Sequence, residues 1–346
     1  MTHRAGSTIV FAAVLTAAAS TVPAPRVDWE KQSSGVTARL RGISAVSRSV
    51  VWASGASGTI VRSIDGGGTW QRRSIAGAEA LDFRDIDAFS DRVAYALSIG
   101  PGEASRIYKT TDGGEHWLLQ LANQDPQIFL DSMAFWDAER GVAFSDSTDG
   151  RFAVFTTIDG GRKWHRIAPG LLPSALEGEG AFAASGTNVG VAAGDRVWIG
   201  TTAGRILRSM NAGKTWTISK TPIHTDRSAG IFSIAFRNAS DGIAVGGDFN
   251  TLDAAIDNVA VTNDAGATWT IGKGLRGYRS VVAWARSGRG PAVAIGPSGA
   301  DISIDGGRSW TAAGAEGYDT AAFAPGTSTG WSAGDKGRIA KFTIHE

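Results

Sequence analysis

The stretch that decides the fold is SIDGGGTW at residues 63–70, because the chain repeats it with small changes five more times. The other copies are TTDGGEHW (110–117), TIDGGRKW (157–164), SMNAGKTW (209–216), TNDAGATW (262–269) and SIDGGRSW (303–310). All six fit the pattern S/T-x-D-x-G-x-x-W, with asparagine replacing aspartate in the fourth copy. A repeat spaced by roughly 40 to 55 residues has the period of propeller blades or similar arrays.

Each copy is expected to form a turn between the third and fourth strands of a blade. In the first unit, residues 40–46, 50–54, 59–63 and 70–74 read as strands separated by glycine and serine turns. The carboxylate of Asp65 can accept hydrogen bonds from turn amides, and Trp70 can carry apolar surface into the sheet packing. The sequence therefore predicts structural roles for the repeated aspartate or asparagine (Asp65, Asp112, Asp159, Asn211, Asp264 and Asp305) and tryptophan (Trp70, Trp117, Trp164, Trp216, Trp269 and Trp310).

The same pattern counts seven units, although only six carry the repeat. Inner strands are expected at residues 83–87, 130–135, 232–236, 278–282 and 318–322. Unit four leaves two alternatives, 180–182 or 188–191, with 171–179 as a long surface loop ahead of them. The last unit, residues 330–342, lacks a fourth strand, which residues 26–31 with Trp29 can supply. We therefore predict an all-β fold: residues 25–346 form one seven-bladed β-propeller of four-stranded antiparallel blades, in which the N-terminal strand completes the last blade.

The first 24 residues have the composition of a secretory signal peptide. A basic start at His3 and Arg4 precedes an apolar run over residues 9–19, and small residues and two prolines follow. A disordered or membrane-retained leader is the alternative. No later segment reaches about 18 consecutive apolar residues, so no membrane span is expected in the mature chain. The sequence predicts a periplasmic or secreted protein.

The composition excludes several classes of function. The 34 basic and 33 acidic residues nearly cancel, which argues against nucleic-acid binding. The chain has no cysteine, its five histidines form no zinc motif, and its acidic loops lack calcium-binding spacing. No dinucleotide-binding fingerprint is present. We expect a monomer with no metal and no cofactor.

The repeat is the Asp-box, or bacterial neuraminidase repeat, and longer phrases narrow the resemblance. Residues 55–70 and 330–339 resemble the photosystem II stability/assembly-factor type of propeller, including its exported bacterial branch of unsettled role. The resemblance covers residues 26–346. It implies a propeller that binds assembly intermediates, as the plant and cyanobacterial members do. Asp-boxes also occur in sialidases and some glucan-degrading enzymes, where they lie on the rim, away from the central site.

Alignment of the inner strands places one side chain per blade at the propeller axis. The aligned positions are Arg41, Arg84, Asp131, a residue of unit four (Glu179 or Thr187), Phe232, Arg279 and Asp319. Guanidinium groups pair with carboxylates, so this ring predicts a pocket for an anion or a sugar, with Arg41, Arg84, Asp131, Arg279 and Asp319 as ligand-binding residues. Alternatively, these charges pair with one another across a wet channel and hold the blades in position.

Two functions are compatible with this ring. The leading hypothesis is an exported, non-catalytic propeller that binds a protein or peptide partner and assists assembly or stabilisation of an envelope complex. The alternative is a glycan-active enzyme, sialidase-like or another glycoside hydrolase. Its candidate catalytic carboxyl groups are Asp131, Asp319 and Glu179, since glycoside hydrolysis requires two carboxyl groups about 5–10 Å apart. The sequence favours the hypothesis without catalysis, because it contains no recognisable catalytic set.

Overall fold

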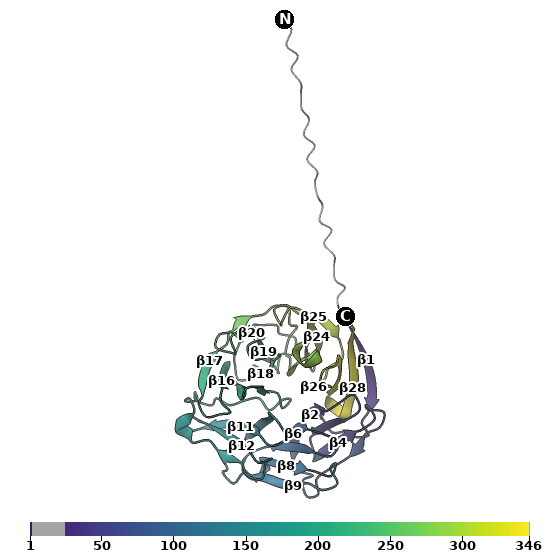
Figure 1. The fold of residues 1–346 in the computed structure, drawn as a ribbon, viewed down its shortest axis with the longest axis vertical. Helices are drawn as coiled ribbons and strands as arrows, with labels where there is room; N and C mark the ends of the chain where they lie inside the picture. Colours follow the sequence, from purple (N-terminus) through teal and green to yellow (C-terminus); the bar gives the residue numbers. More distant parts are fainter. Residues whose placement is uncertain (2–24, 346) are drawn as a thin grey trace.

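Seven four-stranded antiparallel sheets stand around a central axis like the blades of a propeller (Figure 1). The computed structural model describes Met1 and residues 25–345. The predicted signal peptide, residues 1–24, lies outside the described residues except for Met1, and it stays a prediction. Within the described part of the chain, no helix is long and apolar enough to cross a bilayer. The predicted seven-bladed architecture is confirmed.

Each of the first three blades follows chain order from the axis outwards. Blade one contains β2 (Leu40–Ala45), β3 (Val51–Gly55), β4 (Thr59–Ser63) and β5 (Gln71–Arg72). Blade two contains β6 (Asp82–Ala88), β7 (Ala94–Ile99), β8 (Arg106–Thr110) and β9 (Leu118–Ala122). Blade three contains β10 (Leu130–Phe135), β11 (Gly141–Thr148), β12 (Arg151–Thr157) and β13 (His165–Arg166).

The next three blades repeat this order. Blade four contains β14 (Val189–Ala192), β15 (Arg196–Gly200), β16 (Arg205–Ser209) and β17 (Thr217–Lys220). Blade five contains β18 (Ala229–Phe236), β19 (Gly242–Asp248), β20 (Val259–Thr262) and β21 (Thr270–Ile271). Blade six contains β22 (Val281–Trp284), β23 (Ala292–Gly296), β24 (Gly299–Ser303) and β25 (Thr311–Gly314). Four short 3₁₀ turns lie in connections of the described chain: η1 (Gly102–Ala104), η2 (Pro169–Leu171), η3 (Ala285–Gly288) and η4 (Asp335–Gly337).

Blade seven joins the two ends of the described chain. It contains β26 (Thr320–Phe323), β27 (Thr329–Ala333), β28 (Arg338–His345) and, as its outer strand, β1 (Arg26–Ser33). The ring of Trp29 in β1 packs 5.0 Å from that of Phe342 in β28, and its Nε1 donates a 2.9 Å hydrogen bond to the Ala313 carbonyl of blade six. The Nε1 of Trp117 makes the equivalent bond to blade one, at the Arg73 carbonyl. Trp29 thus replaces the tryptophan of the missing seventh repeat, and the predicted closure is confirmed.

The hydrophobic core lies between the blades. One cluster joins Leu40 and Val61 of blade one to Trp331 of blade seven, and another joins Val259 of blade five to Val282 of blade six. Burial of apolar surface at about 25 cal/mol per Å² therefore stabilises the junctions as well as the single sheets.

The six Asp-boxes form nearly identical turns. In every copy the first hydroxyl accepts a hydrogen bond from the amide of the fifth residue, at 2.8–3.0 Å. The third side chain accepts one from the amide of the seventh residue, at 2.9–3.0 Å. In the first box these bonds, led by that from the amide of Thr69, lower the pKa of Asp65 to about 2. Gly67 has φ +91°, a conformation that favours glycine.

Two details of the predicted strands are changed. In blade four the inner strand is β14, so the alternative at 188–191 holds and residues 180–182 belong to a connection. In blades six and seven the inner strands begin at Val281 and Thr320, and not at Tyr278 and Tyr318. Both tyrosines lie in the connections that lead into these strands.

Candidate functional site

Four inner strands carry a β-bulge close to the end at which they begin. The pairing with the neighbouring strand skips one residue in each: Arg41 in β2, Arg84 in β6, Asp131 in β10 and Phe232 in β18. A bulge inserts one extra residue and changes the direction of its side chain. The alignment of inner strands placed these same four residues at the axis. In these four blades, the predicted axial residue is therefore the bulged residue of the inner strand.

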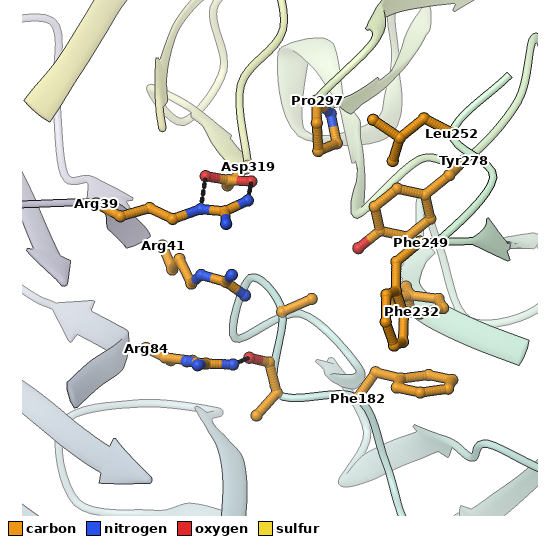
Figure 2. Close-up of a pocket in the computed structure, with 12 residues that line it drawn as sticks. Arg39, Arg41, Arg84, Phe182, Phe232, Phe249, Leu252, Tyr278, Pro297 and Asp319 are labelled. Carbon is orange, nitrogen blue, oxygen red and sulfur yellow. Dashed lines mark hydrogen bonds and ion pairs between the residues drawn. The ribbon is translucent and has the colours of Figure 1, made fainter. Parts of the chain in front are cut away.

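A pocket of about 540 Å³ lies at the axis, on the face where the inner strands begin (Figure 2). It has a cationic wall and an aromatic wall, and its lining residues are Arg39, Arg41, Arg84, Phe182, Ala183, Ala184, Phe232, Phe249, Leu252, Tyr278, Pro297 and Asp319. The third strand of a blade runs in the same direction as the first, so the Asp-boxes, which follow third strands, lie towards the opposite face. The boxes and the pocket are thus separated by the length of a blade.

The cationic wall consists of three arginines whose partners differ. Arg39 forms a bidentate pair with Asp319, with N–O distances of 2.7 and 2.6 Å. Arg84 bonds to Asp82 at 2.8 Å and to a backbone carbonyl. The guanidinium of Arg41 lies between them (Figure 2) and has no hydrogen bond or ion pair with any described residue. Burial, and then repulsion from Arg84 and Arg39, lower the pKa of Arg41.

The aromatic wall faces these arginines across the pocket (Figure 2). Phe182 stacks on Phe232 with ring centroids 3.9 Å apart, and Phe249 meets both rings edge-on. Tyr278 meets Phe232 edge-on at 4.6 Å, and burial raises the pKa of its phenol. An apolar or aromatic group of a ligand would find complementary surface here.

The inner end of the pocket is closed by residues 182–187, which we call the axial segment. It lies in the connection from blade three to blade four and bonds to three other blades. The Ala183 carbonyl accepts from Arg84 of blade two at 2.8 Å, and the Ser185 hydroxyl donates to the Ser280 carbonyl beside blade six at 2.7 Å. The Ser185 carbonyl accepts from Thr320 of blade seven at 3.3 Å. A segment that contacts blades on several sides of the ring must cross the axis. It makes the pocket blind.

Asp131, a predicted ring member and catalytic candidate, does not line the pocket. Its side chain is buried, and neither carboxylate oxygen has a hydrogen-bond partner among the described residues. Burial and then the nearby Asp146 carboxylate raise the pKa of Asp131 well above its usual range. Asp131 therefore occupies the same bulge position as Arg41 and Arg84, but its carboxyl is buried outside the pocket.

Arg279, another predicted ring member, is also outside the pocket. Its N–H donates to the Gly246 carbonyl of the preceding blade, just as Tyr318 donates to Gly296 and Leu40 to Gly334. Arg279 thus takes the buried position of Leu40 and Tyr318, one residue before the axial position, which Ser280 occupies in blade six. Its guanidinium is 1% exposed and pairs with buried Asp301 at 2.7 Å.

Neither of the two residues that could represent blade four in the axial ring, Glu179 and Thr187, lines the pocket. Glu179 is buried and accepts hydrogen bonds from Thr201 at 2.6 Å and from Arg205 at 2.9 Å. The hydroxyl of Thr187 bonds to that of Ser233 at 2.8 Å. Of the aligned ring, the structure therefore brings together Arg41, Arg84, Phe232 and Asp319.

Of the three carboxyl groups considered for catalysis, the pocket contains only Asp319, and Arg39 holds it in an ion pair. Among the residues that the structure describes, no three His, Cys, Asp or Glu side chains form a group that could hold a metal ion. The lining supplies anion binding and apolar contact.

The sequence alignment did not identify Arg39, Phe182, Phe249 or Tyr278 as pocket residues. The two-residue period of a strand could have indicated Arg39, because Arg39 lies two residues before Arg41 and side chains two residues apart point to the same side. The others lie in connections, where no periodic pattern exists.

Comparisons with known proteins agree with this architecture. Residues 22–167 match the family model described as photosynthesis system II assembly factor YCF48. This part of the chain, less than half of its length, is similar to the YCF48 family. The resemblance to this type of assembly factor is therefore confirmed. No protein of curated function matches the sequence significantly.

Three solved structures show the same likeness. "YCF48 bound to D1 peptide" has a TM-score of 0.64 at 17% identity and covers 91% of this chain and 96% of its own. YCF48 from Cyanidioschyzon merolae has a TM-score of 0.63 at 17% identity, with 91% and 98% covered. The WD40 propeller domain of Doa1 has a TM-score of 0.62 at 12% identity, with 91% and 97% covered. At these identities the likeness establishes the fold.

Proposed function

We propose that this chain is an exported, non-catalytic propeller that binds a segment of a partner protein in its axial pocket and acts in assembly or stabilisation of an envelope complex. The observation that carries the proposal is the pocket itself: a blind cavity in which arginines face aromatic rings. Its volume of about 540 Å³ falls within the usual range of binding sites, about 300–1,000 Å³.

The relatives support a peptide as the ligand. One YCF48 structure is described as bound to D1 peptide, and the matching family is described as an assembly factor. The export and the envelope complex rest on the predicted leader over residues 1–24.

A glycoside hydrolase is the less favoured alternative. Its two carboxyl groups must flank the scissile bond, about 5–10 Å apart in the same cleft. Asp131 and Glu179 are buried outside the pocket, and Asp319 is paired with Arg39. Of the three candidate carboxyl groups, a hydrolytic mechanism in this pocket would have only Asp319, which is already in an ion pair with Arg39.

Site-directed photocrosslinking in the cells that make the protein tests this function. A benzoylphenylalanine replaces Phe249, which is 45% exposed at the pocket, and in a control replaces Leu118, which is 64% exposed on β9. We expect the probe at position 249 to crosslink to one defined segment of a partner in the envelope fraction, and Arg41→Gln to abolish that product.

Identical products from the two probe positions would contradict binding at the pocket, as would a product that survives Arg41→Gln. Recovery of the full-length protein in the cytoplasmic fraction would contradict export. Turnover in a panel of glycosides and sialosides that Asp319→Asn abolishes would establish the enzymatic alternative.

A further inference from the structure

The connection that closes the axial pocket is attached to blade three by a buried carboxyl group. The Asp146 Oδ1 of β11 accepts a 2.9 Å hydrogen bond from the amide of Ala181, the residue directly before the axial segment. A side chain at Gly180 would collide with this carboxyl, so the close approach requires glycine. Gly180 itself is fixed separately, because its amide and carbonyl both bond to Thr202, at 3.1 and 2.9 Å. The bond to Asp146 is therefore the first contact of the chain as it leaves this anchor and crosses the axis.

Asp146 has a second carboxyl group beside it, that of Asp131 in β10. Asp131 is 1% exposed, and neither of its carboxyl oxygens has a hydrogen-bond partner among the described residues. A buried, unpaired carboxylate is strongly unfavourable, and a second negative charge next to it adds repulsion. Burial and then the Asp146 carboxylate accordingly raise the pKa of Asp131 well above its usual range. When Asp131 is protonated, its O–H is a donor for which the Asp146 carboxylate is an acceptor.

The other charged groups around the pair act more weakly or elsewhere. Arg84 of β6 favours the ionised form of Asp131, but burial and Asp146 outweigh it. Its guanidinium is already bonded to Asp82 and to a carbonyl of the axial segment. Asp85 of β6 is also buried, but it lies at the far end of the axial segment and accepts a 2.7 Å bond from a backbone amide of blade three.

The sign of the pH effect follows from the proton on Asp131. While the axial segment is in place, burial and Asp146 hold this proton at pH values at which an exposed aspartate, with a pKa of about 3.9, is ionised. Release of the segment would let water reach the pair and return the pKa of Asp131 towards that ordinary value. The closed form is therefore favoured at low pH, and this preference is lost as the pH rises from about 4 to the raised pKa of the closed form.

We propose that a proton on Asp131 controls closure of the axial pocket. With the proton in place, Asp146 holds Ala181 and the axial segment stays across the channel. Ionisation of Asp131 repels Asp146, frees the Ala181 amide and releases the segment, so that the pocket loses its inner end and Phe182 leaves the aromatic wall (Figure 2). This inference goes beyond the proposed function, because it concerns the shape of the cavity whatever the cavity binds.

Hydrogen exchange followed by mass spectrometry tests the inference without a ligand. Exchange of peptic fragments from residues 180–187 is measured between about pH 5 and 9 and corrected for the intrinsic pH dependence of amide exchange. An opening that releases one proton becomes about tenfold more favourable per pH unit until the raised pKa is reached. We expect the protection of this segment to fall with that slope. Fragments from β15 and β16 of the adjacent blade should keep their protection.

Three variants assign the effect to the carboxyl pair. In Asp131→Asn the side chain is neutral at every pH and its amide can donate to Asp146, so the segment should stay protected and the pH slope should disappear. Asp149→Asn removes a carboxylate from the exposed turn between β11 and β12 of the same blade and should behave like the wild type. Asp146→Ala removes the acceptor of the Ala181 amide, so the segment should exchange at least tenfold faster than in the wild type at pH 5.

Each other outcome would overturn the inference. The same slope in Asp131→Asn and in the wild type would show that another group carries the proton. Constant protection of the wild-type segment over the whole pH range would show that closure does not depend on pH. A parallel loss in β15 and β16 would mean that the whole propeller unfolds and the segment does not open by itself. Because no ligand is used, each of these results leaves the proposed peptide-binding function to its own test.

Discussion

Arg41 and Arg279 occupy the same column in the aligned sequence, yet the structure predicts opposite effects when each is replaced by methionine. Methionine keeps part of the apolar stem and removes the charge. The guanidinium of Arg279 is 1% exposed and bonds to Asp301, whose side chain is 0% exposed. Loss of one partner from a buried pair costs about 3–5 kcal/mol. Arg276 still bonds to Asp301 at 2.7 Å, so we expect the lower end of this range, about 3 kcal/mol.

Arg41 has no such pair, and its two neighbours repel it. Arg41→Met should therefore change the free energy of unfolding by less than about 0.5 kcal/mol, or increase it slightly. Urea unfolding followed by tryptophan fluorescence measures both variants against the wild type. At a slope of about 3 kcal/mol per M, Arg279→Met shifts the midpoint by about 1 M and Arg41→Met leaves it unchanged. Equal losses in the two variants would refute the assignment of Arg41 to the pocket and of Arg279 to the scaffold.

Three further predictions concern closure of the ring, closure of the channel and pH. Trp29→Ala should lower the free energy of unfolding by about 3 kcal/mol, because it removes the aromatic contact between β1 and β28. Urea unfolding measures this loss, and an unchanged midpoint would show that closure of the ring does not depend on this side chain. Gly186→Ala should lower the free energy of unfolding by about 1–3 kcal/mol in the same assay, because its Cβ would collide with the Asp85 carboxyl. Gly178 also has a positive φ but has open space around it, so Gly178→Ala should cost less. Equal losses in the two variants would mean that backbone strain alone is responsible. Burial raises the pKa of Asp87 to about 7, so the folded state holds this proton more tightly than the unfolded chain, and its contribution to stability is lost as the pH rises from about 4 to 7. Asp87→Asn should raise the thermal midpoint relative to wild type at pH 8 and not at pH 4, and a pH-independent difference would contradict this explanation.

The architecture could be predicted because its signals are local and repeated. Each Asp-box marks the end of a third strand, so six copies locate six blades, and the third strand predicted at residues 59–63 coincides with β4. The seventh blade followed from a strand pair without a box and from Trp29 at the other end of the chain. Trp29 in the outer strand of blade seven donates the same hydrogen bond to the preceding blade as Trp117 of the second box, so it has the same packing role.

The alignment of inner strands identified four pocket residues: Arg41, Arg84 and Phe232 at bulges, and Asp319 in a blade whose inner strand has none. At Arg41, Arg84 and Phe232 the aligned residue is the bulged residue of the inner strand, and its side chain lines the pocket. The alignment therefore identified the axial position in these three blades. At Arg279 the alignment is one residue early, because hydrogen bonds between blades set the position, and these bonds leave no trace in the local sequence. Phe182 and Phe249 lie in connections, so only the folded ring brings them to the axis.

The axial segment explains how a general scaffold acquires a specific site. A propeller has a channel along its axis, and inner strands supply one side chain per blade to it. Here the connection from blade three to blade four crosses this channel and brings Phe182 against Phe232 while its Ala183 carbonyl engages Arg84. The same connection therefore closes the pocket, supplies part of its aromatic wall and occupies one of its three arginines. Arg41 is left as the guanidinium available to an anion, so the specificity depends on this one connection while the boxes on the opposite face maintain the ring.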